Sequence, residues 1–175
     1  MSELRKANTN YPYFITCTVV QWVDVFTRSI YANVLIESLK YCQQHKGLEV
    51  YGYVIMSSHI HLIVRHEGAQ LDKIIGHFKS FTAKEILKLI ESSQEESRKK
   101  WLLHLFAYAA RFHQQHAQYM FWQYTKHPVE LSSPEIFQQK LDYIHQNPLA
   151  AGYVTEAEKW YYSSANLFSP LKVKR

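Results

Sequence analysis

The chain of 175 residues has few of the features that mark secreted, fibrous or membrane-embedded proteins. Its only cysteines, Cys17 and Cys42, are too few for a disulfide framework or a thiolate metal site, which favours a reducing compartment. Five glycines, five prolines and no low-complexity tract argue against a collagen-like or disordered chain. Because no run of eighteen apolar residues and no apolar leader is visible, we expect a cytoplasmic protein without a membrane span.

The composition is that of one globular domain with a basic surface. Hydrophobic residues make up 47% of the chain, so we expect a single domain over residues 1–175 with a C-terminal tail from about 156. Twenty Lys and Arg against fifteen Asp and Glu give a net charge of +5, and the pI is near 9.1. This balance fits either a nucleoid-associated, nucleic-acid-binding protein or a merely basic soluble one, because only a clustered patch distinguishes them.

Hydrophobic periodicity predicts the order of secondary structure. Alternation or β-branched and aromatic runs predict strands at 12–20, 48–56, 59–66 and 119–124. Apolar residues at helical spacing predict helices at 29–45, 71–90 and 101–116, with 91–100 as a loop or frayed extension. A last helix is capped by Ser133 and ended by Pro148. The order predicts an α+β, ferredoxin-like (split βαβ) antiparallel sheet, with helices on one face and the C-terminal helix over the other.

The strongest local pattern is the His-Ile-His segment at 59–61. Alternate side chains of a strand share a face, so His59 and His61 project together while Ile60 points to the opposite side. Two neutral imidazoles at this spacing can bind one cation. The alternative is that they are two structural histidines among the ten in the chain.

A second pattern lies on the last helix, where Tyr143 and Asn147 are four residues apart and share a face. A phenol beside a bound cation can attack a phosphodiester, and a carboxamide oxygen can serve as a further ligand to a hard cation. Alternatively, Tyr143 is a core tyrosine and Asn147 an ordinary turn residue before Pro148.

Together these segments resemble a known family. VIMSSHIHLIV at 54–64, FWQ at 121–123 and LDYIHQNPLAAGYV at 141–154 are similar to single-tyrosine HUH transposases, and most similar to the REP-associated tyrosine transposase branch. The resemblance extends from about Tyr13 to Phe168.

The resemblance implies a function for this chain. It implies that His59 and His61 bind magnesium or manganese, and that Tyr143 is the nucleophile that cuts single-stranded DNA through a 5′-phosphotyrosine intermediate. Asn147 stands where many relatives have Gln, as a third metal ligand. The DNA is expected to form hairpins, and both monomers and homodimers occur in this class.

Candidates for DNA contact are basic or aromatic residues outside these motifs. Arg65 is the leading one, because alternation along the strand puts it on the face of the two histidines. The others are Lys79, Lys84, Arg111 and Trp122. Each of these cations could instead be a solvated surface charge, and the tryptophan could instead belong to the core.

Three functions remain open from the sequence. The first is an active DNA strand transferase, favoured because His59, His61 and Tyr143 are all present. The second is a domesticated, non-mobile protein that binds DNA hairpins. The third is a metal-dependent phosphohydrolase that uses the two histidines and leaves Tyr143 idle.

Overall fold

A four-stranded antiparallel sheet forms the middle layer of the computed structural model, which describes residues 10–68, 70–112, 118–124 and 128–174. Its strands are β1 Tyr13–Thr18, β2 Glu49–Ile55, β3 His59–Arg65 and β4 Val129–Glu130. The spatial order is β2-β3-β1-β4, and every neighbouring pair runs antiparallel. This order confirms the predicted ferredoxin-like arrangement.

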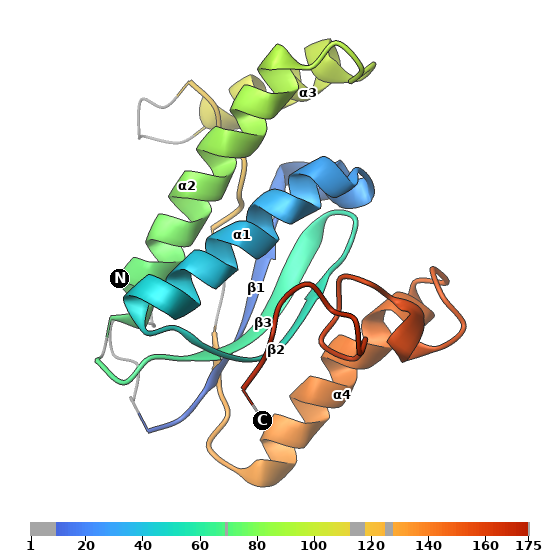
Figure 1. The fold of residues 1–175 in the computed structure, drawn as a ribbon. Helices are drawn as coiled ribbons and strands as arrows, with labels where there is room; N and C mark the ends of the chain where they lie inside the picture. The colour runs from blue at the N-terminus through green and yellow to red at the C-terminus, as the bar shows by residue number, and fades with distance from the viewer. Residues whose placement is uncertain (1–9, 69, 113–117, 125–127, 175) are drawn as a thin grey trace.

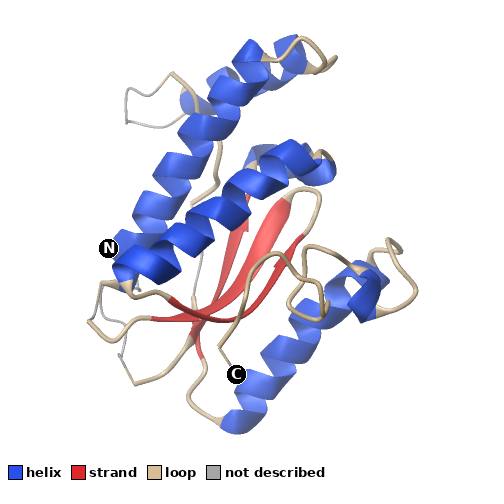
Figure 2. Ribbon diagram, in the orientation of Figure 1, coloured by secondary structure: helices blue, strands red, loops and turns tan. Residues whose placement is uncertain are grey.

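Helices cover the two faces of the sheet unequally (Figures 1 and 2). α1 and α2 lie over one face and pack against each other, while α4 lies alone over the other. The four helices are α1 Ser29–Lys46, α2 Leu71–Ser92, α3 Lys99–Ala110 and α4 Pro134–Ala150. Within the described ranges, no helix combines the length and the apolar character needed to cross a bilayer.

The apolar side chains of β3 divide between these two layers. Ile60, Leu62 and Val64 are fully buried in the larger core, beneath α1 and α2. Ile63 belongs to the smaller core beneath α4, together with Ile144 of that helix. Side chains at odd-numbered positions of β3 therefore face α4, as the alternation predicts.

Helix α4 begins as its sequence predicts and ends slightly later. The Ser133 hydroxyl accepts a hydrogen bond from the backbone N–H of Ile136, and Pro134 occupies the first turn. Pro148 does not end the helix, which continues to Ala150. A proline in the last turn removes a single helical hydrogen bond, and the carbonyl of Asn147 accepts the Ala151 N–H just beyond it.

The predicted strand at 119–124 is wrong. In that segment Trp122 makes only an isolated bridge with Val19, and the fourth strand is β4. Neighbouring residues of a strand point to opposite faces, yet Phe121 and Trp122 are both buried in the larger core. The predicted helix at 101–116 is observed as α3, which begins at Lys99 and ends at Ala110. Residues 111–112 form a turn, so the prediction is wrong there, and residues 113–116 lie outside the described part.

The C-terminal segment pairs with the free edge of β2. Ile55 N–H donates to the Tyr162 carbonyl, Ser164 N–H donates to the Tyr53 carbonyl, and Lys174 N–H donates to the Val50 carbonyl. The short 3₁₀ helix η4, Ala157–Lys159, connects this segment to α4. An edge strand that would otherwise expose its backbone polar groups is thus covered by its own chain.

A buried carboxylate connects the turn between α2 and α3 to the start of α1. Glu96 is 4% exposed, and its oxygens lie 3.1 Å from Arg28 Nε and 3.2 Å from Arg98 Nε. Tyr31 also donates to it from 3.3 Å. Burial alone would raise the pKa of Glu96, but Arg98 and Arg28 outweigh that effect and hold the pKa below its ordinary value of 4.5.

Glu96→Gln should lower the free energy of unfolding at neutral pH by about 1–3 kcal/mol, because Arg28 and Arg98 lose the negative charge and one of the two oxygens that accept from them. Since the folded-state pKa of Glu96 is depressed, its contribution is present above pH 4.5 and is lost as the pH falls through the folded value. Urea unfolding from pH 7 down to pH 3 should therefore show the two proteins converging at the acid end. The matched control is Glu95→Gln, at an exposed neighbouring carboxylate. If the difference in unfolding free energy between the parent and Glu96→Gln were as large at pH 3 as at pH 7, the charge of Glu96 would not be the source of the stability.

Candidate active site

Two imidazoles lie side by side on the α4 face of the sheet. The rings of His59 and His61 are 4.7 Å apart between centroids. Each ring uses its Nδ1 for a protein hydroxyl: Thr16 Oγ1 lies 2.8 Å from that of His61, and Ser58 Oγ lies 3.1 Å from that of His59. The Nε2 atoms are therefore the nitrogens available to a bound group.

Burial keeps these imidazoles neutral. It lowers the pKa of His61 to about 3, with smaller contributions from the nearby charges of His59 and Lys140. Burial also lowers the pKa of His59. Nε2 of His61 is buried and has no hydrogen-bond partner. A neutral ring with an unsatisfied nitrogen is the form in which histidine binds a metal ion.

Helix α4 brings Tyr143 to this pair. The phenol ring lies 5.3 Å from the His61 ring and 5.9 Å from the Phe14 ring, edge-on to both. Ile144, the next residue, is fully buried in the smaller core and fixes the helix against the sheet. Tyr143 itself is 49% exposed, so a large substrate can reach its hydroxyl.

Two residues beside this site, Thr16 and Lys140, were not identified in the sequence analysis. Thr16 faces His61 across the β1–β3 pair. Lys140 holds its amine 5.1 Å from the centre of the Phe14 ring and 5.8 Å from that of Tyr143. The spacing of three residues between Lys140 and Tyr143 on one helix could have identified the lysine, whereas Thr16 requires the strand register.

Asn147 lies one turn beyond Tyr143 on the same face of α4. Phe137 near the start of the helix contacts Tyr51, and Tyr153 just after it hydrogen-bonds Ser57, so α4 runs antiparallel to β3. Four helical residues advance about 6 Å and two strand residues about 7 Å. The step from Tyr143 to Asn147 along α4 therefore runs in the direction that leads from His61 to His59 along β3. In the part of the chain that the structure describes, no third histidine, cysteine or carboxylate joins the pair.

A tryptophan borders the pair on the His59 side. Trp22 lies in the short 3₁₀ helix η2, Val20–Trp22, with its ring edge-on to His59 at 5.3 Å. Both Gln21 and Trp22 have positive φ angles, 53° and 57°. The left-handed conformation costs a non-glycine residue roughly 1–2 kcal/mol.

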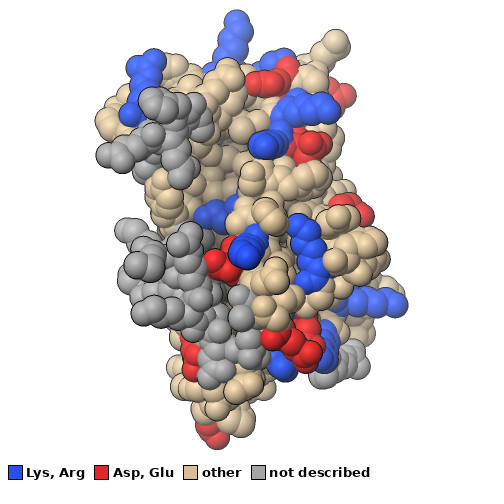
Figure 3. Space-filling model, turned by 90° about the vertical axis from the view of Figure 1, so that its left-hand side faces the viewer, with Lys and Arg blue, Asp and Glu red and all other residues tan. Residues whose placement is uncertain are grey.

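The candidate DNA-binding lysines and Arg111 are not brought to the histidines. Lys79 and Lys84 belong to α2, on the opposite face of the sheet, and Arg111 follows α3. The Lys79 amine donates to the Gln123 carbonyl at 2.7 Å, and burial lowers its pKa. Lys84 and Arg111 are exposed. On the face drawn in Figure 3, lysines and arginines are scattered among acidic side chains and form no continuous patch.

Arg65 occupies the predicted face of β3 but the far end of the strand. Four strand residues separate it from His61, a distance of about 13 Å. Its guanidinium lies 3.7 Å from Glu49 and 3.4 Å from Glu67. The guanidinium of Arg65 is therefore engaged in ion pairs with these two carboxylates.

Trp122 is a core residue. It is 6% exposed, stacks on Phe26 at 5.7 Å, and donates its indole N–H to Thr82 Oγ1 at 3.1 Å. A base cannot stack on a ring that is buried among other side chains. Trp122 therefore serves the core, which was the alternative to a role in DNA binding.

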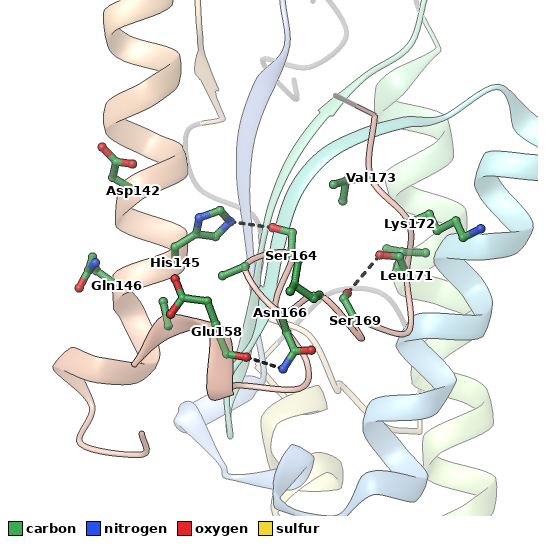
Figure 4. Close-up of a pocket in the computed structure, with 13 residues that line it drawn as sticks. Asp142, His145, Gln146, Glu158, Ser164, Asn166, Ser169, Leu171, Lys172 and Val173 are labelled. Carbon is green, nitrogen blue, oxygen red and sulfur yellow. Dashed lines mark hydrogen bonds between the residues drawn. The ribbon is translucent and has the colours of Figure 1, made fainter. Parts of the chain in front are cut away.

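A separate pocket of about 660 Å³ lies between α4 and the C-terminal segment (Figure 4). His145 of α4 points into it, with Nε2 2.9 Å from Ser164 Oγ. Burial lowers the pKa of His145, and the charges of Asp142 and Glu158 oppose that shift. His145 thus lies two residues from Tyr143 in sequence but faces the tail and not the histidine pair.

Comparisons with known proteins concern the family and the fold of the chain. The family model described as "Transposase IS200 like" matches residues 8–128, a span that contains both histidines and ends before α4. A solved structure of a REP-associated tyrosine transposase bound to a REP hairpin is 17% identical, with a TM-score of 0.64, over 94% of this chain and 82% of that one. At this identity the likeness establishes the fold. Among curated proteins there is no significant match.

Thr82→Val should reduce the free energy of unfolding by about 1–3 kcal/mol, because the buried indole N–H of Trp122 loses its acceptor. Thr82→Ser keeps the hydroxyl and should recover most of the loss. Urea titrations of the three proteins provide the measurement. Equal stabilities of the valine variant and the parent would show that Trp122 is not held in this way.

Proposed function

Because the chain belongs to the IS200-like transposase family, we propose that it cuts and rejoins single-stranded DNA through a covalent 5′-phosphotyrosine on Tyr143. One observation carries the proposal. His59, His61 and Tyr143 form a continuous row, with ring centroids 4.7 and 5.3 Å apart, although the tyrosine comes from a different part of the sequence. A structural role for the histidines alone does not require an exposed phenol beside them.

In the proposed reaction the Tyr143 oxygen attacks the scissile phosphorus and the bond from phosphorus to the 3′-oxygen breaks. The phenol proton passes to solvent, and the departing 3′-oxygen takes up a proton to become a free hydroxyl. A second 3′-hydroxyl later attacks the phosphotyrosine, which restores the phenol and joins the strands. The Lys140 ammonium, 5.8 Å from the centre of the phenol ring, would stabilise the negative charge of a phosphate bound beside that ring.

The donor atoms present suit a divalent cation, which we propose to be magnesium or manganese. His59 and His61 would hold it through Nε2, and the unsatisfied Nε2 of His61 is the observation that supports this assignment. Asn147, one helical turn after Tyr143 on α4, would add a carboxamide oxygen. When bound, the cation would stabilise charge on the phosphate and orient it toward the phenol.

We propose hairpin-forming, single-stranded DNA as the substrate. The net charge of +5 favours phosphate contacts, and the similar REP-associated transposase binds a REP hairpin. The ring of Tyr143 lies beside the histidines of its own chain. This arrangement supports cleavage within one subunit, whether or not the protein forms a homodimer.

The covalent step can be tested with a pool of DNA hairpins whose single-stranded flanks are randomised. Incubation with Mn²⁺ should give a protein–DNA adduct that survives denaturing electrophoresis. Tyr143→Phe should abolish the adduct, because no other oxygen can replace the phenol as nucleophile. Tyr161→Phe is the matched control, since Tyr161 is 50% exposed and Tyr143 is 49% exposed.

Other outcomes distinguish the alternatives. Binding of hairpins by the parent protein without an adduct would favour a non-mobile hairpin-binding protein. Cleavage that continues in Tyr143→Phe would favour a phosphohydrolase that uses only the histidines. Either result would overturn the proposed function.

Thr16→Val should weaken Mn²⁺ binding about 10- to 100-fold, because the hydroxyl that orients the His61 ring is lost. Isothermal titration calorimetry measures the affinity directly. Thr18→Val makes the same change two residues along β1, opposite His59, and should leave the affinity close to that of the parent. Equal losses of Mn²⁺ affinity in both variants would mean that the substitutions act by disturbing strand β1 and not by removing the hydrogen bond to His61.

A further inference from the structure

Trp22 is a large apolar ring that the fold leaves in solvent beside the candidate site. It is 60% exposed, whereas Val20 and Val23 on either side are 5% and 6% exposed. Among the described residues, its ring contacts only the His59 ring, edge-on at 5.3 Å. The core therefore gives no reason for an indole at this position.

The backbone holds Trp22 in place at a conformational cost. Among the non-glycine residues that the structure describes, only Gln21 and Trp22 have positive φ. The segment is fixed before and after them: Val20 N–H donates to the Phe121 carbonyl at 2.9 Å and Phe26 N–H donates to the Ser57 carbonyl at 2.8 Å. Backbone strain that a well-anchored loop maintains is typical of functional sites.

We propose that Trp22 stacks on the base of a nucleotide adjoining the scissile phosphate and so positions the DNA across the site. This inference rests on the proposed function. The rings follow the order Trp22, His59, His61, Tyr143, with each neighbouring pair in contact. A phosphate held at the two imidazoles would have the phenol on one side and the indole on the other.

The chemistry of an exposed indole suits this role. Its flat face stacks on any base, so it holds an unpaired nucleotide without selecting a sequence. In double-stranded DNA the same base would be paired and stacked with its neighbours. Trp22 thereby favours unpaired DNA at the point of cleavage.

The test uses the full chain carrying Tyr143→Phe, so that DNA is bound without being cut. The probe is a fluorescein-labelled DNA hairpin with oligothymidine flanks, titrated in Mn²⁺ and followed by fluorescence anisotropy. Trp22→Ala should weaken binding about 5- to 100-fold, whereas Trp22→Phe should retain most of the affinity. Trp101→Ala is the matched control, because Trp101 is 51% exposed on α3.

Abasic nucleotides placed one at a time along the flanks identify the stacked base. At one position the abasic probe should bind the parent and Trp22→Ala equally, because the base that the indole contacts is missing. The proposal would be overturned if Trp22→Ala bound the hairpin as tightly as the parent does. It would also be overturned if Trp22→Ala lowered the affinity by the same factor for every abasic probe. A parallel loss of Mn²⁺ affinity would instead assign Trp22 to orienting His59.

The outcome is independent of the adduct experiment. If the parent forms the adduct and Trp22→Ala binds normally, only the stacking role fails. If no adduct forms but the abasic pattern is seen, Trp22 remains a DNA-stacking residue and the covalent mechanism fails.

Discussion

Successive side chains of β3 face opposite helical layers of the fold, and the candidate site depends on this alternation. Ile60 and Leu62 are fully buried beneath α1 and α2, so they fix which face the intervening His61 must take. A shift in strand register by one residue would bury the imidazoles in the larger core and expose isoleucine to α4. The hydrophobic core therefore determines the geometry of the histidine pair.

The candidate site combines a buried side and an open side. Burial removes water from His61 and keeps its ring neutral, with a pKa of about 3. Tyr143 and Trp22 lie at the solvent border, 49% and 60% exposed. On the proposed function, the cation is held from the buried side and the DNA approaches from the open side, without any part of the fold having to open.

Features that depend on local periodicity were predictable from the sequence, and features that depend on distant pairing were not. The face shared by His59 and His61 follows from the strand period, and the start of α4 follows from Ser133 and Pro134. The failure at 119–124 has a physical reason: an aromatic run can fill a core without pairing as a strand. Trp22 was missed because its exposure depends on the positive φ angles of a loop, for which the sequence carries no glycine signal.

The order in which the site's parts occur along the chain has a consequence for biosynthesis. The imidazole pair is complete by residue 61, whereas the phenol is encoded at residue 143 and reaches the pair only when α4 docks on the finished sheet. On the proposed function, a partly translated polypeptide would carry the two imidazole ligands without the nucleophile. On the proposed function, a nascent chain close to nucleic acid would be unable to nick it before folding is complete.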